Sequence, residues 1–209
     1  MFITLEGIDG CGKSTQAALL VEGLRRRFCP APPPEGMSVL WTKEPGGWTG
    51  GDSIRSLILE GNLLHPLSEL FLFLADRCEH VRQVVGPALE QGRIVVCERY
   101  TDSTLAYQSW GRGIPPEKVE RLFQWCAFPV PDVTFWIDVP PEKALRRLRK
   151  RGHPDRLEAE GAEFLERVRS GFSSLALGSG GRILTIDGDR DADVISLEIA
   201  GAVERFLSR

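Results

Sequence analysis

The chain has 209 residues, of which 42% are hydrophobic and 26% are charged, so one globular domain covering residues 1–209 is the simplest expectation. Its net charge of −3 argues against a general nucleic-acid-binding protein, and no apolar run reaches the ~20 residues of a membrane span. The five cysteines form no Cys-x-x-Cys pair and no signal peptide precedes the first apolar run, so we expect a cytoplasmic protein.

The N-terminal segment carries the most specific motif. A short apolar run, residues 1–6, has strand character, and residues 15–28 show the apolar spacing of a helix. Between them stands GIDGCGKST, which has the spacing Gly-x-x-x-x-Gly-Lys-Ser of a phosphate-binding loop. Strand, glycine loop and helix in this order are the context that the motif requires.

This loop predicts binding of a magnesium–nucleotide complex. Its glycines let successive backbone N–H groups point inward around an anion, and the following helix adds the positive end of its dipole. Lys13 can reach the β- and γ-phosphates, and Ser14 can ligate Mg²⁺. The motif does not separate a kinase from a switch or a motor. The residues expected to contact the nucleotide are Gly7, Ile8, Asp9, Gly10, Cys11, Gly12, Lys13, Ser14 and Thr15.

The later elements alternate between strands and helices. Further strands are expected over residues 38–42, 93–98, 132–139 and 182–187. Helices are expected over residues 53–61, 66–91, 101–127 around the turn GRGIPP, 141–152, 162–177 and 192–207. This order predicts an α/β fold of three layers, the P-loop NTPase fold, with helices on both faces of a five-stranded parallel sheet. Ligands of such sheets bind beyond the carboxyl ends of the strands, where we place Glu6, Glu98, Asp138 and Asp187.

A second polar cluster follows the strand at residues 93–98, in the sequence CERYTDSTLAYQ. Arg99 has the planar fork that binds phosphate with two hydrogen bonds. Ser103, Thr104, Tyr107 and Gln108 are spaced to share one face of a helix. An alternative is that Thr101, Asp102 and Ser103 only cap this helix, which would leave Arg99 and Gln108 unexplained.

Several segments together resemble one family, the bacterial thymidylate kinases, which phosphorylate dTMP with ATP. The matching segments are LEGIDGCGKSTQ, KEPGG followed by GDSIRSLIL, LFLFLADR, ERYTDSTLAYQ and RGHPDRLEAEGAEFLERVRSGF. They run from residue 2 to about residue 175 in the family's order and spacing. The resemblance implies that ATP occupies the phosphate loop, that dTMP is the acceptor, and that the protein is a homodimer.

The resemblance also implies roles for residues of a dTMP site. Phe73 would stack on thymine, although by itself it would more often be a core residue, and Arg77 would hydrogen-bond the base. Thr104 and Gln108 would read the pyrimidine edge, and Tyr107 would pack by the sugar and disfavour a 2′-hydroxyl. Residues surrounding the sugar and phosphate, or shaping the pocket wall, would be Asp9, Glu44, Pro45, Arg55 and Arg99.

The basic run at residues 146–152 resembles the start of the family's lid, about residues 149–158, which closes over ATP. A solvated helix face is the ordinary alternative for such a run. Family members carry a catalytic arginine in either the phosphate loop or the lid, and the loop position here is Gly10. The resemblance therefore implies the lid type, with Arg151 and Arg156 as the candidates and Arg149 not excluded. The implied catalytic set is Lys13, Arg99, Arg151 and Arg156, and the implied metal ligands are Ser14 and Glu98.

Three positions depart from the family's usual residues. Glu98 replaces an aspartate, Lys43 replaces an arginine, and Trp48 replaces a threonine. The nearest rival function is a deoxynucleoside kinase acting on thymidine, but Arg55 and Arg99 would then lack an acceptor phosphate. A nucleotide-dependent switch would need a guanine-reading motif such as Asn-Lys-x-Asp, which the sequence lacks. A non-catalytic relative is disfavoured because Lys13, Ser14 and the arginines are intact.

Overall fold

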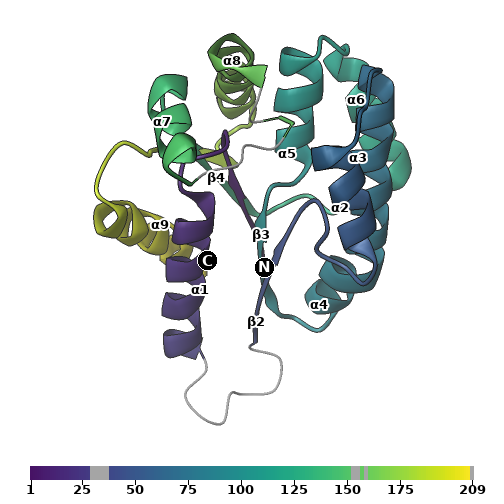
Figure 1. Cartoon of the computed structure of the whole chain (residues 1–209). Coiled ribbons are helices and arrows are strands. Elements are labelled where there is room, and N and C mark those ends of the chain that lie inside the picture. Colours follow the sequence, from purple (N-terminus) through teal and green to yellow (C-terminus); the bar gives the residue numbers. More distant parts are fainter. Residues whose placement is uncertain (29–37, 152–155, 158–159, 208–209) are drawn as a thin grey trace.

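The computed structural model describes residues 1–28, 38–151, 156–157 and 160–207. Five parallel strands form a single sheet in the order β2-β3-β1-β4-β5 (Figure 1). The strands are β1 (Phe2–Glu6), β2 (Val39–Lys43), β3 (Ile94–Glu98), β4 (Val133–Asp138) and β5 (Ile183–Asp187). The expected five-stranded parallel sheet is confirmed, and each strand lies within two residues of its predicted bounds.

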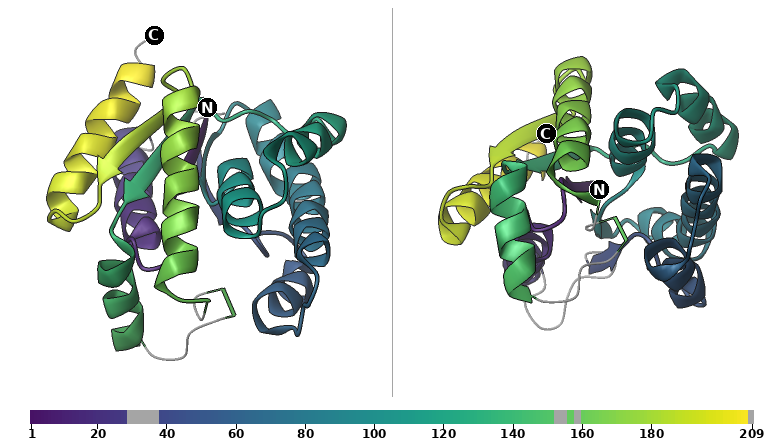
Figure 2. Two further views of the ribbon diagram at one scale, coloured as in Figure 1. Left: turned by 90° about the horizontal axis from the view of Figure 1, so that it is seen from above. Right: turned by 45° about the horizontal axis from the view of Figure 1, so that its top comes forward.

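Helices cover both faces of the sheet, as the alternating pattern predicts. Helices α1 and α9 pack together on one face, and α4, α8 and the η2 segment lie on the other (Figure 2). The helices before β4 are α1 (Lys13–Phe28), α2 (Gly51–Glu60), α3 (Pro66–His80), η1 (Val81–Val85), α4 (Gly86–Glu90), α5 (Thr101–Thr104), η2 (Leu105–Gly111) and α6 (Pro116–Cys126). Those after it are α7 (Pro141–Arg151), α8 (Ala162–Gly178) and α9 (Ala192–Leu207).

The strand register brings the ends of the central strands to one edge of the sheet. Leu5 pairs with Glu98 and Glu6 pairs with Trp136, so β1, β3 and β4 end at nearly the same level. All residues of β1 and β3 are buried because helices cover both of their faces. The phosphate loop and the segment after β3 therefore leave the sheet side by side, where this fold class binds ligands.

The long helix expected over residues 66–91 is one helical run with a wider turn inside it. The π-helical turn η1 separates α3 from α4, and the Gly86 N–H donates to the carbonyl of Val81. Pro87 has no N–H and cannot continue the regular ladder, which accounts for the wider turn. A second π-helical segment, η2, carries Tyr107 and Gln108, and such segments are frequent at functional sites.

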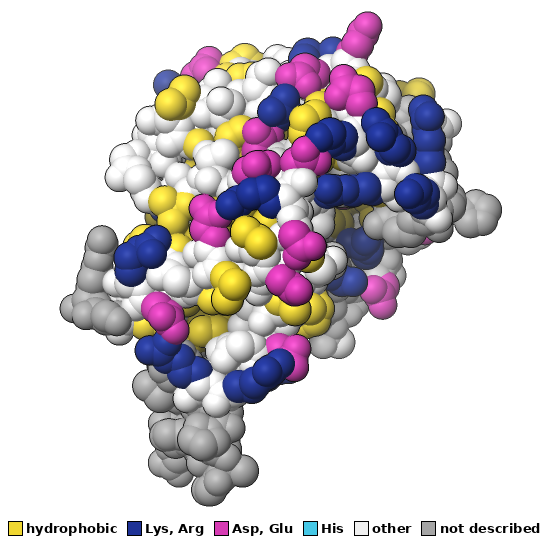
Figure 3. Space-filling view, turned by 90° about the vertical axis from the view of Figure 1, so that its left-hand side faces the viewer, with side chains coloured by type: hydrophobic (Ala, Val, Ile, Leu, Met, Phe, Trp, Pro, Cys, Tyr) yellow, Lys and Arg dark blue, Asp and Glu magenta, His cyan; other side chains and the backbone are white. Residues whose placement is uncertain are grey.

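The surface is mixed in charge. On the face formed by α1, α7 and α9, lysines and arginines lie among acidic residues (Figure 3). Arg146, Arg149 and Lys150 of α7 are exposed, so this part of the basic run is a solvated helix face. Among the described residues, no helix combines the length and apolar character needed to cross a bilayer.

Candidate active site

The phosphate loop connects β1 to α1 and has the backbone shape that its glycines allow. Gly7, Gly10 and Gly12 all have positive φ, a region that residues with a Cβ rarely adopt. A Cβ on Gly10 would lie 2.6 Å from the carbonyl oxygen of Ala144, because α7 packs directly against the loop. Gly10 therefore has no room for the arginine that some family members carry in the loop.

Lys13 and Ser14 stand at the start of α1 and face the loop. The Lys13 ammonium donates to the carbonyl oxygens of Gly7 and Ile8, at 3.0 and 2.9 Å, so the side chain folds over its own loop. The Ser14 hydroxyl donates to Glu98 Oε2 at 2.5 Å, which joins the two expected metal ligands directly. Trp41 holds the other Glu98 oxygen from its indole N–H at 3.0 Å.

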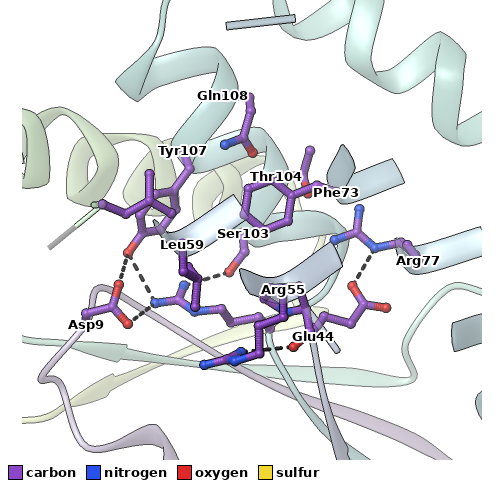
Figure 4. Close-up of a pocket in the computed structure, with 13 residues that line it drawn as sticks. Asp9, Glu44, Arg55, Leu59, Phe73, Arg77, Ser103, Thr104, Tyr107 and Gln108 are labelled. Carbon is purple, nitrogen blue, oxygen red and sulfur yellow. Dashed lines mark hydrogen bonds and ion pairs between the residues drawn. The ribbon is translucent and has the colours of Figure 1, made fainter. Parts of the chain in front are cut away.

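A pocket of about 520 Å³, counting the part open to solvent, lies beside the loop (Figure 4). All ten residues expected at a dTMP site line it, together with Leu59, Ser103 and Leu157. These ten residues come from the phosphate loop, the β2–α2 loop, α2, α3, the β3–α5 junction, α5 and η2. The tertiary structure thus brings the whole predicted set together.

Arg99 is the most highly connected residue of this pocket. Its Nη2 donates to Asp9 Oδ1 at 2.6 Å and to the Tyr107 hydroxyl at 3.2 Å, while Nη1 donates to Ser103 and to the carbonyl of Gly7. Arg99 also has a φ of 65°, which is uncommon for a residue with a side chain. Burial by itself would raise the pKa of Asp9, but Arg99 and Lys13 hold that pKa well below its usual range.

Glu6, at the end of β1, holds the turn that carries Arg99. One carboxylate oxygen accepts from the Tyr100 N–H at 2.7 Å, and the other accepts from the Ser103 hydroxyl. Burial and the nearby charge of Asp102 raise the pKa of Glu6 to about 7. Asp102 itself binds Arg182 and Thr134, and no side chain caps α5, so the capping alternative for Asp102 and Ser103 is wrong.

Glu44 and Arg77 form a buried ion pair at the other end of the pocket. Arg77 Nε donates to Glu44 Oε2 at 2.7 Å, and His80 Nδ1 lies 2.8 Å from Glu44 Oε1. The Arg77 and Glu44 side chains are 1% and 2% exposed, so the pair is almost fully desolvated. Trp48 is one of the three residues that differ from the family's usual sequence. Its indole N–H donates to Asp76 Oδ1 at 2.8 Å and so links the loop after β2 to α3.

The inner part of the pocket combines an aromatic ring with unsatisfied polar groups. Phe73 lies across the pocket from Thr104 and Gln108 (Figure 4). The described residues give no hydrogen-bond partner to the buried Thr104 Oγ1 or to Arg77 Nη1. Buried polar groups are nearly always paired, so these two atoms indicate a place where a polar ligand is bound.

Of the two lid candidates, only Arg156 has a side chain among the described residues, and it does not lie at the phosphate loop. Arg156 donates to the carbonyl of Ile58 and, at 2.6 Å, to Glu69, so its side chain points away from the loop. Arg151 ends α7, but its side chain lies outside the described residues, as do residues 152–155 of the lid. The two lid candidates therefore remain predictions.

A second, larger pocket of about 1410 Å³ is lined by the phosphate loop, Arg147, Gly188 and Arg190. It shares Asp9, Glu44, Arg55 and Arg99 with the first pocket. These four residues form the boundary at which ligands in the two pockets would meet. Sequence reasoning did not identify Leu59, Leu157, Glu69 or His80, since nothing in their local patterns distinguishes them from ordinary helix and loop residues.

The fold and the site together define a class. A parallel sheet in this order, with a phosphate loop after β1 and a second polar pocket opening onto it, is the P-loop fold of nucleoside monophosphate kinases. The known thymidylate kinase from Ehrlichia chaffeensis has the same fold, with a TM-score of 0.79, 35% identity and 98% of each chain covered.

Sequence comparison narrows the class to one family. The family model described as thymidylate kinase matches residues 5–199. A thymidylate kinase from Synechococcus sp. (strain JA-2-3B'a(2-13)) is 46% identical, and one from Methylococcus capsulatus is 41% identical. Each comparison covers 99% of this chain and 96% of the relative. The chain belongs to the thymidylate kinase family.

Proposed function

We propose that the chain transfers the γ-phosphoryl group of ATP to dTMP and forms ADP and dTDP, a step toward dTTP. The observation that carries this proposal is the pair of pockets that share Asp9, Glu44, Arg55 and Arg99. Holding two reactants in adjoining sites converts a bimolecular reaction into an effectively unimolecular one. The phosphoryl group passes directly from donor to acceptor, and no covalent intermediate with the protein is needed.

On the acceptor side, Arg99 and Arg55 bind and orient the dTMP phosphate. Arg99 is held in place by Asp9, Ser103 and Tyr107, so its guanidinium is fixed before the ligand arrives. Arg55 is anchored through one nitrogen to the carbonyl of Pro45 at 2.9 Å, and it lines both pockets. The acceptor phosphate is already nucleophilic, so a strong general base is not required.

On the donor side, the loop N–H groups and Lys13 bind the phosphates of ATP. Within the described residues, no group of three or more His, Cys, Asp or Glu could hold a metal alone. That fits Mg²⁺, which is usually bound by one or two protein groups, substrate phosphates and water. Ser14 and Glu98 would hold it, since their oxygens adjoin at the loop. When bound there, Mg²⁺ would supply positive charge that offsets the negative charge developing on the transferred group.

The base of dTMP occupies the inner pocket. Phe73 stacks on the thymine ring, and Arg77 Nη1 and Thr104 Oγ1 supply the unpaired polar atoms for its edge. Tyr107 packs beside the sugar, where its ring, held by Arg99 and Asp9, leaves little room for a 2′-hydroxyl. This arrangement favours a deoxyribose pyrimidine monophosphate over a ribonucleotide.

A lid arginine completes the site, and Arg151 and Arg156 are our candidates. Arginines that reach a transferring phosphoryl group raise the rate by ~10³ to 10⁵. For Arg156 to act in this way it must leave Glu69 and Ile58. Lid closure over both substrates would exclude water and limit ATP hydrolysis.

A homodimer is supported by an apolar surface on α3 and α6. Leu67 and Phe71, one helical turn apart, are 41% and 54% exposed, and Trp125 of α6 is 83% exposed. Cys78 Sγ of α3 lies 3.9 Å from Cys126 Sγ of α6, so the two helices lie side by side. Two thiols that are close but not joined by a disulfide fit the reducing cytoplasm expected from the sequence. Light scattering of the wild-type protein should give a molecular mass twice that of one chain. The Phe71→Asp variant should give the mass of a single chain.

The activity is tested with purified protein, ATP and Mg²⁺. ADP release is measured with dTMP, thymidine, dUMP, ribothymidine monophosphate and dCMP offered in parallel. We expect turnover with dTMP far above the others. Turnover with thymidine but not dTMP would refute the roles given to Arg55 and Arg99, while leaving the phosphate loop intact.

A further inference from the structure

We call the pocket of about 520 Å³, in which dTMP is proposed to bind, the acceptor pocket. Glu69 of α3 is a buried carboxylate behind the part of this pocket that would hold the base. It is 2% exposed and does not itself line that pocket. Oε1 accepts from Gln108 Nε2 at 2.9 Å and from Arg112 Nε at 3.2 Å. Oε2 accepts from Arg112 Nη2 at 3.2 Å and from Arg156 Nη2 at 2.6 Å. Glu69 is thus surrounded by donors on both oxygens.

The environment keeps Glu69 ionised. Burial would raise the pKa of its carboxyl, but the hydrogen bonds from Arg112, Gln108 and Arg156 hold that pKa below its usual value. An ionised carboxylate can only accept hydrogen bonds, whereas a glutamine amide has a donor end and an acceptor end. Gln108 must therefore direct its NH₂ group toward Glu69.

The other end of the Gln108 amide is then available to the pocket. Gln108 is 1% exposed and lines the pocket, and its oxygen points toward Phe73 and Thr104 (Figure 4). We infer that Glu69 is a positioning residue that fixes the orientation of the Gln108 amide, so that the pocket presents an acceptor oxygen to the pyrimidine base. This inference rests on the proposed function, in which the base occupies this pocket.

The consequence is discrimination between pyrimidines. Thymine and uracil carry a donor N–H at ring position 3, whereas cytosine carries an acceptor nitrogen there. An amide free to rotate could serve either base, but an amide held by Glu69 pairs with the donor and faces cytosine with a second acceptor. When the Gln108 oxygen faces the cytosine ring nitrogen, two buried acceptors meet with no donor between them. This lowers kcat/KM on the order of tenfold or more.

The test uses Glu69→Gln. Glu69 Oε2 accepts from two guanidinium groups, whereas Oε1 accepts from one guanidinium and from the neutral amide of Gln108. The new amide would therefore keep its oxygen at the Oε2 position and place its NH₂ at the Oε1 position, facing Gln108. Gln108 would then turn over to accept from it, and its own NH₂ would face the base. We expect kcat/KM for dTMP to fall about tenfold. The ratio of kcat/KM for dTMP to that for dCMP should fall by at least the same factor.

Two comparisons separate positioning from a merely structural role. Arg112→Met removes an ion pair from the same carboxylate but leaves the bond from Gln108, so it should lower the melting temperature and keep the dTMP:dCMP ratio. In a Gln108→Ala background, Glu69→Gln should leave the ratio unchanged, because the amide it orients is absent. A fall in the ratio in that background, or in Arg112→Met, would overturn the inference.

The outcomes distinguish this inference from the proposed function. A wild-type enzyme inactive on dTMP would reject the proposed function itself. A wild-type enzyme that prefers dTMP, with the preference unchanged in folded Glu69→Gln, would reject only the role of Glu69. If Glu69→Gln does not fold, NMR of the wild-type protein decides. Side-chain NH₂ protons of Gln108, assigned by their loss in Gln108→Ala, should exchange slowly with and without dTMP, and fast exchange would refute the inference.

Discussion

The two pockets that meet at Arg99 are built in different ways. The phosphate-loop pocket is large, at about 1410 Å³, and a single continuous segment, residues 9–16, forms much of its lining. The acceptor pocket is smaller, at about 520 Å³, and consists of side chains from several distant elements that are hydrogen-bonded to one another. The glycine loop offers backbone N–H groups suited to a general ligand group such as a phosphate chain, whereas the acceptor pocket offers a preassembled set of side chains suited to a specific one.

The two pockets also differ in the free-energy cost of building them, because the acceptor pocket contains a buried ion pair. Burying an ion pair such as Arg77–Glu44 removes two charges from water, and the attraction between them often only offsets that penalty. Such a pair therefore contributes little net stability. Under the proposed function, its benefit would be a guanidinium already oriented for the base, so that less ordering is needed when dTMP binds.

Replacing Arg99 should have the largest effect because it belongs to both pockets. We expect Arg99→Met to lower kcat/KM for dTMP by about 10³ or more, the loss expected for a preorganised charged donor. Steady-state kinetics with each substrate varied would measure it. Arg112→Met is the matched control, since it removes a half-buried arginine that lines neither large pocket. A loss of kcat/KM below tenfold in Arg99→Met would contradict the proposal that Arg99 contacts the ligands of both pockets where they meet.

Replacing Lys13 should affect the phosphate-loop pocket alone. Lys13→Met is expected to lower kcat by ~10² to 10³ because it removes one positive donor from the transferring phosphoryl group. The Kd for dTMP, measured by calorimetry without ATP, should stay within about twofold, since Lys13 does not line the acceptor pocket. A large change in that Kd would show that the two pockets are not separable.

The buried Glu6 behind Arg99 should make stability depend on pH. Its pKa is raised from 4.5 to about 7 in the folded protein, so between these values the native state binds a proton that the unfolded chain does not. Stability should therefore fall as pH rises from about 4.5 to about 7, by roughly 3 kcal/mol from this group.

Urea unfolding at pH 5, 6, 7 and 8 would measure this dependence. Glu6→Gln keeps an acceptor for the Tyr100 N–H, replaces the oxygen that accepts from Ser103 by an NH₂ group, and cannot ionise. The difference between wild type and Glu6→Gln should therefore decline with rising pH over this window. A difference that is constant or rises with pH would refute the assignment.

Removing the Phe73 ring should have the smallest effect and act on the acceptor pocket alone. Stacking of a base on an aromatic side chain contributes ~1–3 kcal/mol, so Phe73→Ala should raise the KM for dTMP about tenfold and leave that for ATP unchanged. Leu177→Ala is the control, because Leu177 of α8 is an apolar residue that is 87% exposed and lines neither pocket. Equal effects of the two variants would refute stacking.

The sequence by itself determined the phosphate-loop side of the protein. Glycine, lysine and serine at fixed spacing specify a local backbone path, and alternating strand and helix patterns specify a parallel sheet with both faces covered. Among the ten acceptor-site residues, Arg99, Thr104, Tyr107 and Gln108 already stood out as a polar cluster after a strand, whereas their ligand and the other acceptor-site roles could be named only through the resemblance to a family. Residue spacing places Phe73 and Arg77 on one helical face, but does not say what that face meets.

Tertiary structure alone decided which side chains support the site. Glu6 and Ser103 are 97 residues apart, and Glu69 and Gln108 are 39 apart, so their hydrogen bonds depend on strand register and helix packing. Helix packing also decides two further contacts. It brings α7 against Gly10, and it pairs Arg156 with Glu69. Local patterns report backbone conformation, whereas contacts between distant elements are fixed only when the sheet and its helices assemble.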